Sequence, residues 1–319
     1  MKVIASAPGS IANLGCLFDV AAMAVNIARD FVEVKITKEF NDIVVECNSS
    51  SVPSGNKNSA YYAIKAVLEK YALLGEIGVY VKVYKNVPIA KGFGSSGASA
   101  AAVAYALNSL LGNKLNLREL VACAGYGEIA SAGSIHYDNV AASIYGGLVL
   151  LDLTKREIHI YKVKISEFLI NNIKLVAFIP LKYKKPSTGV MRKILPKYIE
   201  LKDLIKQVSA TAKLIYAIHN DDLKAFGEAI SIGGPIEEAR SRFIPRYWDL
   251  KKACLDAGAL GFNIAGAGPA TFAIIKKDDV GSFLERVKKI VGNILNEYEI
   301  KLLDIERIGA KIEPCHGRL

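Results

Sequence analysis

Alternating apolar and polar residues predict strands in the first half of the chain. The pattern is clearest in three short stretches, at 31–37 (FVEVKIT), 42–47 (DIVVEC) and 79–84 (VYVKVY). A period of two is typical of strands that bury one face. Two glycines lead into a fourth stretch, 145–153 (YGGLVLLDL), which we also expect to form a strand.

Helical spacing separates these strands. Apolar residues three and four positions apart predict a helix at 58–71, and an alanine-rich helix should end near residue 111. Another helix should start behind Asn116, because an asparagine side chain can accept a hydrogen bond from a first-turn amide.

The second half has longer helical patterns and fewer strands. We expect helices at 199–217, 221–230, 247–258 and 280–298, and strands at 173–180, 271–275 and 301–308. Mixed elements without regular alternation predict an α+β fold in both halves. Charged residues with little periodicity at 154–159 (TKREIH) place a boundary there, so the expected domains are 1–160 and 161–319.

The composition is that of a folded protein. Of 319 residues, 51% are hydrophobic and 23% are charged, which excludes a disordered chain. No apolar run approaches the roughly 18 residues of a membrane helix, and the start lacks the apolar core of a signal peptide. The five cysteines include no C-x-x-C pair and predict reduced thiols. We therefore expect a cytoplasmic protein.

The net charge of +10 raises the question of an anionic partner. The lysines are spread along the whole chain, and no dense basic tract alternates with aromatic residues. This distribution favours attraction of a small anion such as ATP over binding of nucleic acid. The single glutamine, Gln207, among many Lys, Glu and Ile residues is typical of a thermophilic source.

The stretch GFGSSG at 92–97 matches the G-x-G-x-x-G pattern of dinucleotide-binding turns. Such a turn follows a strand directly and needs a second strand ending in an acid about 20 residues on. Here a spacer precedes the loop, and the acid at that distance, Glu119, lies in a predicted helix. No G-K-[ST] follows, so a Walker A loop is excluded as well. A small-residue loop before a helix start instead favours binding of another phosphate.

Three other clusters combine small residues with polar side chains. The first is 7–20, with Asn13 and Asp19, and the second is 127–147, with Glu128, His136, Asp138 and Asn139. The third is the small-residue turn NIAGAGPATFAII at 263–275. Each alone has an ordinary structural explanation, as a cap, a helix end or a hairpin. Together they indicate a ligand site that needs close backbone approach.

These motifs resemble those of the GHMP kinases, the small-molecule kinases named for galactokinase, homoserine kinase, mevalonate kinase and phosphomevalonate kinase. PIAKGFGSSGASAA is similar to their second motif, and IAGAGPATFAII to their third. APGSIANLGCLFDV, HYDNVAASIYGG, PSTGVMRKILP and EEARSRFIP are most similar to the homoserine kinase family. The resemblance runs from residue 5 to about 275. It implies the GHMP kinase fold, with an N-terminal α/β domain like those of ribosomal proteins and a C-terminal ferredoxin-like α+β domain.

The chain departs from the family pattern at several positions. Leu17 replaces a glycine, Tyr137 a proline, and Glu238-Ala239 a proline and often a tyrosine. Alanines replace the hydroxyl residues of the third motif at Ala265, Ala267 and Ala270. These alanines imply packing rather than phosphate contact, and Leu17 and Tyr137 leave open whether substrate choice is altered.

The resemblance implies phosphorylation of the side-chain hydroxyl of L-homoserine by ATP with Mg²⁺, a step of threonine biosynthesis. The ATP loop would comprise Pro88, Ile89, Ala90, Lys91, Gly92, Phe93, Gly94, Ser95, Ser96, Gly97 and Ala98, with the adenine near 52–62. Ser96 and Glu128 would hold Mg²⁺.

The same resemblance implies an amino-acid pocket. Arg192 and Arg240 would bind the α-carboxylate, for which a planar guanidinium is suited, and Asp19 would pair with the ammonium. Asn13, His136, Asp138 and Asn139 would line the pocket, and Thr188 is a further candidate. The family is usually thought to lack a catalytic aspartate, so the hydroxyl would attack directly, and whether any residue acts as a general base stays open.

Three alternatives remain at this point. Another GHMP kinase would phosphorylate mevalonate, shikimate or a sugar, but such a substrate has no need of Asp19 with paired arginines. A non-catalytic nucleotide-binding protein would not need Ser96, Glu128 and Asp138. An RNA-binding protein would need a basic or aromatic stripe. We expect no nucleic-acid or membrane partner, and the resemblance also allows a homodimer.

Overall fold

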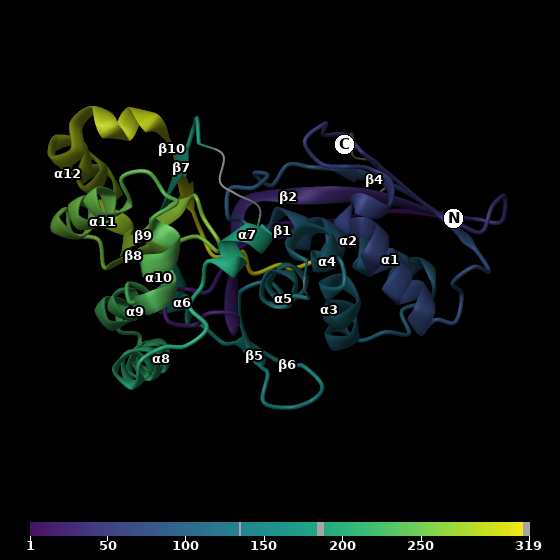
Figure 1. The fold of residues 1–319 in the computed structure, drawn as a ribbon, viewed down its shortest axis with the longest axis horizontal. Coiled ribbons are helices and arrows are strands. Elements are labelled where there is room, and N and C mark those ends of the chain that lie inside the picture. The colour runs from purple at the N-terminus through teal and green to yellow at the C-terminus, as the bar shows by residue number, and fades with distance from the viewer. Residues whose placement is uncertain (134, 184–187, 315–319) are drawn as a thin grey trace.

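The computed structural model describes residues 1–133, 135–183 and 188–314, which form two sheets with helices packed on them (Figure 1). The first sheet has the order β11-β1-β2-β4-β3, and β5 and β6 extend it from the other end of the long strand β2. Its strands are β1 (Lys2–Ala12), β2 (Ala21–Thr37), β3 (Ile43–Cys47), β4 (Gly78–Tyr84), β5 (Leu148–Asp152), β6 (His159–Val163) and β11 (Lys311–Glu313).

Helices pack against the buried face of this sheet and share one core with it. The strands contribute alternate residues such as Val32 and Val34, and the central helix contributes mainly alanines. Because alanine adds little bulk, the central helix lies close to the sheet while other helices pack on its outer sides. They are α1 (Ser59–Lys70), α2 (Ser95–Leu110, central), α3 (Leu117–Gly125), α4 (Glu128–Ala132) and α5 (Asp138–Tyr145).

The second sheet is antiparallel throughout, in the order β10-β7-β9-β8. Val176 and Phe178 of its strand β7 face one core with α11 and α12, and Leu175 and Ala177 face another with α8 and α9. The strands are β7 (Ile173–Pro180), β8 (Gly261–Ile264), β9 (Thr271–Lys276) and β10 (Tyr298–Leu303). The helices are α6 (Glu167–Asn172), α7 (Thr188–Lys193), α8 (Leu201–Asn220), α9 (Leu223–Ile230), α10 (Gly234–Ser241), α11 (Tyr247–Asp256) and α12 (Val280–Val291).

The two sheets are joined by a shared core. Ile11 and Met23 from the first sheet pack in one cluster with Phe226 of α9 and Ile274 of the second sheet. Phe93, in the middle of the glycine loop, is fully buried in the same cluster. The glycine loop is therefore fixed where the two sheets meet.

The α+β class and most predicted elements are confirmed. The helix predicted at 280–298 is too long, because α12 ends at Val291, where Gly292 has a φ of +56° and terminates it. A 3₁₀ turn, η3 (Gly292–Glu297), follows, and the strand predicted at 301–308 is β10, which starts earlier. The helix expected behind Asn116 is divided into α3 and α4. Sequence patterns missed α5, α7 and α10, which are short and carry site residues; the segment of α7 was expected to be a loop.

The domain division at residue 160 stays a prediction. Strand β6 crosses that position, and β11, from the end of the chain, pairs with β1 in the first sheet.

Among the described residues no helix is long and apolar enough to cross a bilayer. Cys16, Cys47, Cys123 and Cys254 are free thiols, and Cys315 lies outside the described residues.

Candidate active site

A cavity of about 310 Å³ lies between the first-sheet helices and the β8–β9 hairpin. Its walls come from segments far apart in the sequence: 51–59 before α1, the glycine loop, the start of α4 and the hairpin turn. This volume is in the range of small-molecule pockets. Its lining includes the residues Ser59, Lys85, Ser95, Ser96, Glu128, Asn139 and Gly266.

The glycine loop needs its glycines because it presses against the hairpin. Gly92 has a φ of +98°, and a Cβ there would lie 2.2 Å from the carbonyl oxygen of Ala265. Gly94, with a φ of +61°, precedes α2 and offers no side chain to cap it. The first-turn amides of α2 thus lack a side-chain cap beside the cavity, an arrangement that favours an anion. The buried Ser95 Oγ also lacks a hydrogen-bond partner among the described residues.

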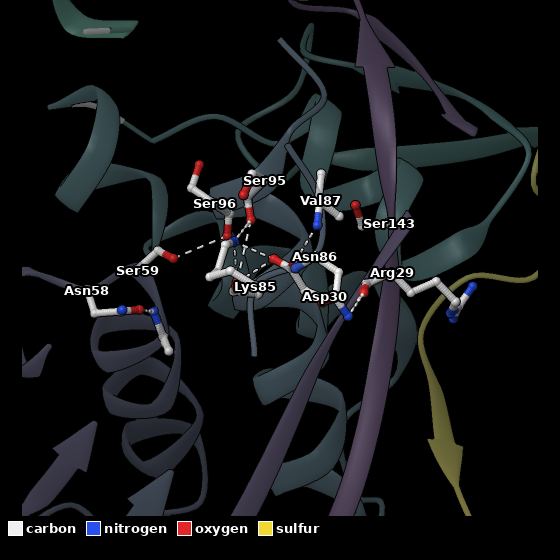
Figure 2. Close-up of polar contacts among 12 residues, drawn as sticks. Arg29, Asp30, Asn58, Ser59, Lys85, Asn86, Val87, Ser95, Ser96 and Ser143 are labelled. Carbon is white, nitrogen blue, oxygen red and sulfur yellow. Dashed lines mark hydrogen bonds and ion pairs between the residues drawn. The ribbon is translucent and has the colours of Figure 1, made fainter. Parts of the chain in front are cut away.

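A buried ion pair anchors this loop from below (Figure 2). Lys85 Nζ pairs with Asp30 Oδ2 and donates to the Ser95 carbonyl at 2.6 Å and to Ser99 Oγ at 2.7 Å. The other Asp30 oxygen accepts from the backbone amides of Asn86 and Val87. The network therefore ties the start of α2 to β2 and to the end of β4.

Sequence reasoning missed this pair, although the strand pattern contained a signal for it. Alternate residues of a strand face the same side, and in β2 Asp30 is on the core-facing side with Val32 and Val34. In the same way Lys85, just after β4, follows the core-facing Val81 and Val83. Phe31 pairs with Tyr84 in the antiparallel register, so the two charged residues come next to each other. When two neighbouring strands each place a charged residue on the side that faces the core, the two residues are expected to pair, because buried charges are rarely unpaired.

A hydroxyl and a carboxylate meet at the cavity wall. Ser96 Oγ donates to Glu128 Oε2 at 3.1 Å, and the Glu128 side chain is buried. Within the described ranges there is no group of three or more His, Cys, Asp and Glu residues able to hold a metal. Mg²⁺ usually takes one or two carboxylates and completes its shell with water and substrate phosphate. This donor set fits Mg²⁺ only together with a phosphate ligand.

A second polar cluster lies in the β1–β2 loop and on α7. Arg192 pairs with Asp19 and donates from Nε to His136 at 3.1 Å. Asn13, with a φ of +75°, accepts from the Asp19 amide through Oδ1 and donates from Nδ2 to the Gly266 carbonyl at 3.1 Å. Asn13 thus shapes the loop and fastens it to the hairpin.

Arg240 on α10 completes this cluster. It is only 5% exposed, and its Nη1 donates to the same Gly266 carbonyl at 2.8 Å. Its Nε lacks a partner among the described residues. The guanidinium carbons of Arg192 and Arg240 lie 5.5 and 5.1 Å from the ring centre of Phe18, so both cations have cation–π contact with this one ring. A buried cation with an unused donor is suited to an anionic ligand.

Burial and the two arginines set the protonation of the neighbouring groups. Burial, assisted by both arginines, lowers the pKa of His136 to about 4, so the imidazole is uncharged at neutral pH. Burial lowers the pKa of Arg240 to about 10, which leaves it charged. Burial, with a contribution from Asp19, raises the pKa of Asp138 to about 6. Asp138 starts α5, and its Oδ1 accepts from the Asn139 amide at 2.7 Å.

The two clusters meet at Gly266, which lines the cavity and whose carbonyl accepts from Asn13 and Arg240. Asn139 lines the same cavity beside Gly94, and its Oδ1 accepts from Ser10 at 2.9 Å. The structure thus brings Asn13, Asp19, His136, Arg192 and Arg240 together, next to the loop with Ser96 and Glu128. Arg242, the residue after α10, is exposed. The side chain of Thr188 and all of Ser134 lie outside what the structure describes.

Comparisons with known proteins identify the family. The model for the GHMP kinase N-terminal domain matches residues 58–147, and the model for the C-terminal domain matches 214–293. Homoserine kinase of Aeropyrum pernix is 36% identical, with 85% of each chain covered. Homoserine kinase of Sulfolobus acidocaldarius is also 36% identical, over 94% of this chain and 95% of its own. The chain belongs to the homoserine kinases, within the GHMP kinases.

Structure comparison agrees with this assignment. The crystal structure of homoserine kinase from Cytophaga hutchinsonii superposes with a TM-score of 0.85 at 30% identity, covering 98% of this chain and 97% of that one. The predicted GHMP kinase fold is therefore confirmed. Two alanines of the third motif pack as expected, since Ala265 and Ala270 are fully buried and the Ala270 amide donates to the Lys91 carbonyl. Ala267 is half-buried and lines the cavity instead.

The Asp30–Lys85 pair gives a prediction about stability. Asp30→Asn leaves a buried lysine without its counter-charge, so we expect the free energy of unfolding to fall by about 3–5 kcal/mol. Urea unfolding followed by circular dichroism measures it. Glu33→Gln on the same strand is the matched control, because its pair with Lys2 is partly exposed and should be worth less than about 1 kcal/mol. Equal losses in both variants would contradict the anchoring role.

The raised pKa of Asp138 gives a prediction about pH. The folded chain holds this proton up to about pH 6, whereas the unfolded chain releases it near 3.8, so the native state is penalised increasingly as pH rises between these values. Asp138→Asn removes the penalty. Relative to the wild type, the variant should gain about 1–3 kcal/mol of stability between pH 4 and pH 8.

Asp152→Asn is the control of opposite sign. Asp152 is half-buried at the end of β5, and hydrogen bonds from Thr154 lower the pKa of its carboxyl, so this variant should lose stability relative to the wild type as pH rises. Thermal unfolding at pH 4 and pH 8 compares the three proteins. If the difference in stability between the wild type and the Asp138 variant is the same at pH 4 and pH 8, the fold does not raise the pKa of the Asp138 carboxyl.

Proposed function

We propose that this chain transfers the γ-phosphoryl group of ATP to the side-chain hydroxyl of L-homoserine, giving O-phospho-L-homoserine and ADP. The observation that carries the proposal is the junction at Gly266, which lines the cavity and accepts hydrogen bonds from Asn13 and Arg240. There, a loop suited to phosphate adjoins a cluster of Asp19, Arg192 and Arg240 suited to a zwitterion. A kinase for a small amino acid needs these two sites side by side, as its relatives' name indicates.

ATP would lie in the cavity with its phosphates against the first turn of α2. The open amides of that turn and the free Ser95 Oγ supply donors, and Lys85 beneath them adds positive charge. Residues 52–59 line the other end of the cavity, which leaves that end for the adenine. Phosphoryl transfer depends mainly on alignment and charge neutralisation, which such a rigid loop provides.

Ser96 and Glu128 would hold Mg²⁺ together with the phosphates. When bound, the ion supplies charge neutralisation at the transferring group. The Ser96 hydroxyl donates to Glu128, so both side-chain oxygens lie at the cavity wall. The Ser59 hydroxyl donates to the Ser96 carbonyl and ties the start of α2 to the start of α1.

Asp19 and Arg192 form an ion pair within the chain. The amino acid would replace this pair with two ion pairs between the protein and the ligand. A zwitterionic ligand offers an ammonium to Asp19 and a carboxylate to Arg192 and to the unused Nε of Arg240. The charges stay balanced before and after binding, which limits the desolvation penalty.

The acceptor hydroxyl would lie beside Asn13 and Asp138, facing the γ-phosphate. Its oxygen attacks phosphorus in line, the bond to the β-phosphate oxygen breaks, and ADP leaves. Because the transition state is loose, the hydroxyl proton need not be removed first, and it can pass to a phosphate oxygen or to Asp138. Asp138 is therefore proposed as a substrate-binding residue.

A cytoplasmic location, expected from the sequence, stays a prediction.

A substrate screen tests the proposed function. ADP release, followed with a coupled enzyme assay, should depend on L-homoserine and not on shikimate, mevalonate or sugars. Shikimate and mevalonate carry a carboxylate but no ammonium group for Asp19, and simple sugars carry neither charge. Activity with any of them and none with homoserine would overturn the proposal.

Two variants separate the two parts of the site. Arg240→Ala should raise the KM for homoserine by roughly 10–100-fold and that for ATP much less, because it removes charged hydrogen bonds to the amino acid alone. Glu128→Gln should raise the Mg²⁺ concentration needed for half-maximal rate and leave the KM for homoserine nearly unchanged. Steady-state kinetics with each substrate and with Mg²⁺ varied in turn measure both.

The matched controls change an exposed arginine and an exposed glutamate, the same residue types as Arg240 and Glu128. Arg242→Ala changes an exposed arginine of the same segment, and Glu157→Gln changes an exposed glutamate. Both should leave all three constants near the wild-type values. An Arg240 variant that affects both substrates equally would remove the carboxylate role, and an unchanged Mg²⁺ titration would remove Glu128 as a ligand.

A further inference from the structure

A cluster of buried polar side chains joins α10 to α11. Glu237 on α10 is only 6% exposed, and it contacts the buried Tyr247 and the nearly buried Lys251 of α11. The lining of the 310 Å³ cavity includes none of these three residues. A charged pair at this depth is costly to desolvate, and an apolar pair would often be as stable. The cluster is therefore expected to do something other than stabilise the fold.

Both oxygens of the Glu237 carboxylate are used. Oε2 accepts from the Gly233 amide at 3.1 Å, and Oε1 accepts from the Tyr247 hydroxyl and pairs with Lys251. Lys251 Nζ also donates to the Ser231 carbonyl at 2.8 Å. The cluster thus connects three parts of the chain: the turn before α10, α10 itself and α11.

The turn before α10 leaves room for this carboxylate. A Cβ on Gly233 would lie 2.4 Å from the Cβ of Glu237 and 2.7 Å from its Oε2, so a glycine is needed for the side chain to fold back. Gly233 is also the N-cap of α10 and has no side chain with which to cap the helix. Glu237 instead accepts from the amide at the helix start, as the acid of a capping box does.

The position of Arg240 depends on α10. Arg240 follows Glu237 by one turn on this helix of eight residues, which is too short to be stable by itself. Its guanidinium reaches the Gly266 carbonyl and lies over the Phe18 ring. A shift or rotation of α10 would move the guanidinium away from both.

Glu237 itself is out of reach of a bound amino acid. Glu237 and Arg240 line a second cavity, of about 10 Å³, together with Asn13 and Gly266. A cavity of this size has room for about one water molecule. An amino acid bound at Arg240 therefore has no space to contact Glu237 through it.

Glu237 also has little effect on Arg240 through its charge. Lys251 neutralises that charge. Burial has the largest effect on the pKa of Arg240, and the ionised groups that follow, Asp19 first, all belong to the amino-acid pocket. What the carboxylate supplies is a fixed orientation of α10, because its donors lie in three different parts of the chain.

We propose that Glu237 is a positioning residue of the amino-acid pocket. By joining the turn before α10 to α11, it holds α10 where Arg240 meets the α-carboxylate of the acceptor. Because the proposed function places that carboxylate at Arg240, this role of Glu237 rests on the proposed function. Glu237 contacts neither substrate.

Steady-state kinetics of Glu237→Gln test this role. The variant keeps the volume of the side chain, but it leaves Lys251 without its counter-charge and exchanges one acceptor for a donor. The KM for homoserine should rise by about 5–20-fold, less than in Arg240→Ala, and the KM for ATP should change by less than about twofold.

The double variant Glu237→Gln, Arg240→Ala distinguishes positioning from an independent effect. If Glu237 acts through Arg240, the KM for homoserine should be no higher than in Arg240→Ala alone, whereas independent effects would multiply. A merely structural role would lower the midpoint of thermal unfolding and the fraction of active enzyme. It would therefore lower the apparent kcat and leave both KM values unchanged.

Glu238→Gln is the matched control, because Glu238 is the next residue of α10 and is exposed, and this variant should keep the wild-type constants. Tyr247→Phe removes one donor to Glu237 and keeps the buried ring, so it should raise the KM for homoserine by about 2–5-fold. This milder variant keeps the test valid if Glu237→Gln fails to fold.

Three results, obtained with a wild type that is active on homoserine, would overturn the role of Glu237 alone. One is an unchanged KM for homoserine in Glu237→Gln or, if that variant does not fold, in Tyr247→Phe. Another is an equal rise of the KM for both substrates. The third is a double variant in which the two effects multiply. A wild type without homoserine-dependent ADP release would instead overturn the proposed function, and this role with it.

Discussion

The site depends on one buried ion pair, Asp30 with Lys85. Two charges in a core are costly to desolvate, and a hydrophobic pair of the same volume would often be as stable. This pair, however, also satisfies two backbone amides after β4 and a carbonyl in the first turn of α2. It fixes the glycine loop between two strands and a helix, so phosphate would meet donors that are already oriented. A hydrophobic pair could not hold the backbone in this way.

A single carbonyl performs a similar task at the amino-acid pocket. The Gly266 oxygen accepts from Asn13, at the end of the first strand, and from Arg240, more than 200 residues later in the chain. The guanidinium of Arg240 is thus held in place relative to both sheets. The ring of Phe18 has cation–π contact with both arginines. Small shifts of one sheet on the other would therefore alter the amino-acid pocket before they altered either core.

Much of the fold could be predicted from the sequence because its strands and helices have clear periods. Strands 31–37 and 79–84 and the helix at 58–71 were found by alternation and spacing. The short helices α5 and α10 were not, because eight residues give too few turns for a period to emerge. Motif resemblance nevertheless located His136, Asp138 and Arg240, which these regions carry. It could not locate Asp30 and Lys85, since their pairing depends on strand register rather than on a motif.

The return of the chain end to the first sheet affects how the protein is made. β11 pairs with β1, so the edge of the first sheet is completed by residues 311–313. β1 is the first of these strands to be synthesised, and β11 follows all the others. During synthesis the outer edge of β1 therefore stays open while the strands of both sheets are translated. The first strand of the chain is thus the last of its sheet to gain its second neighbour.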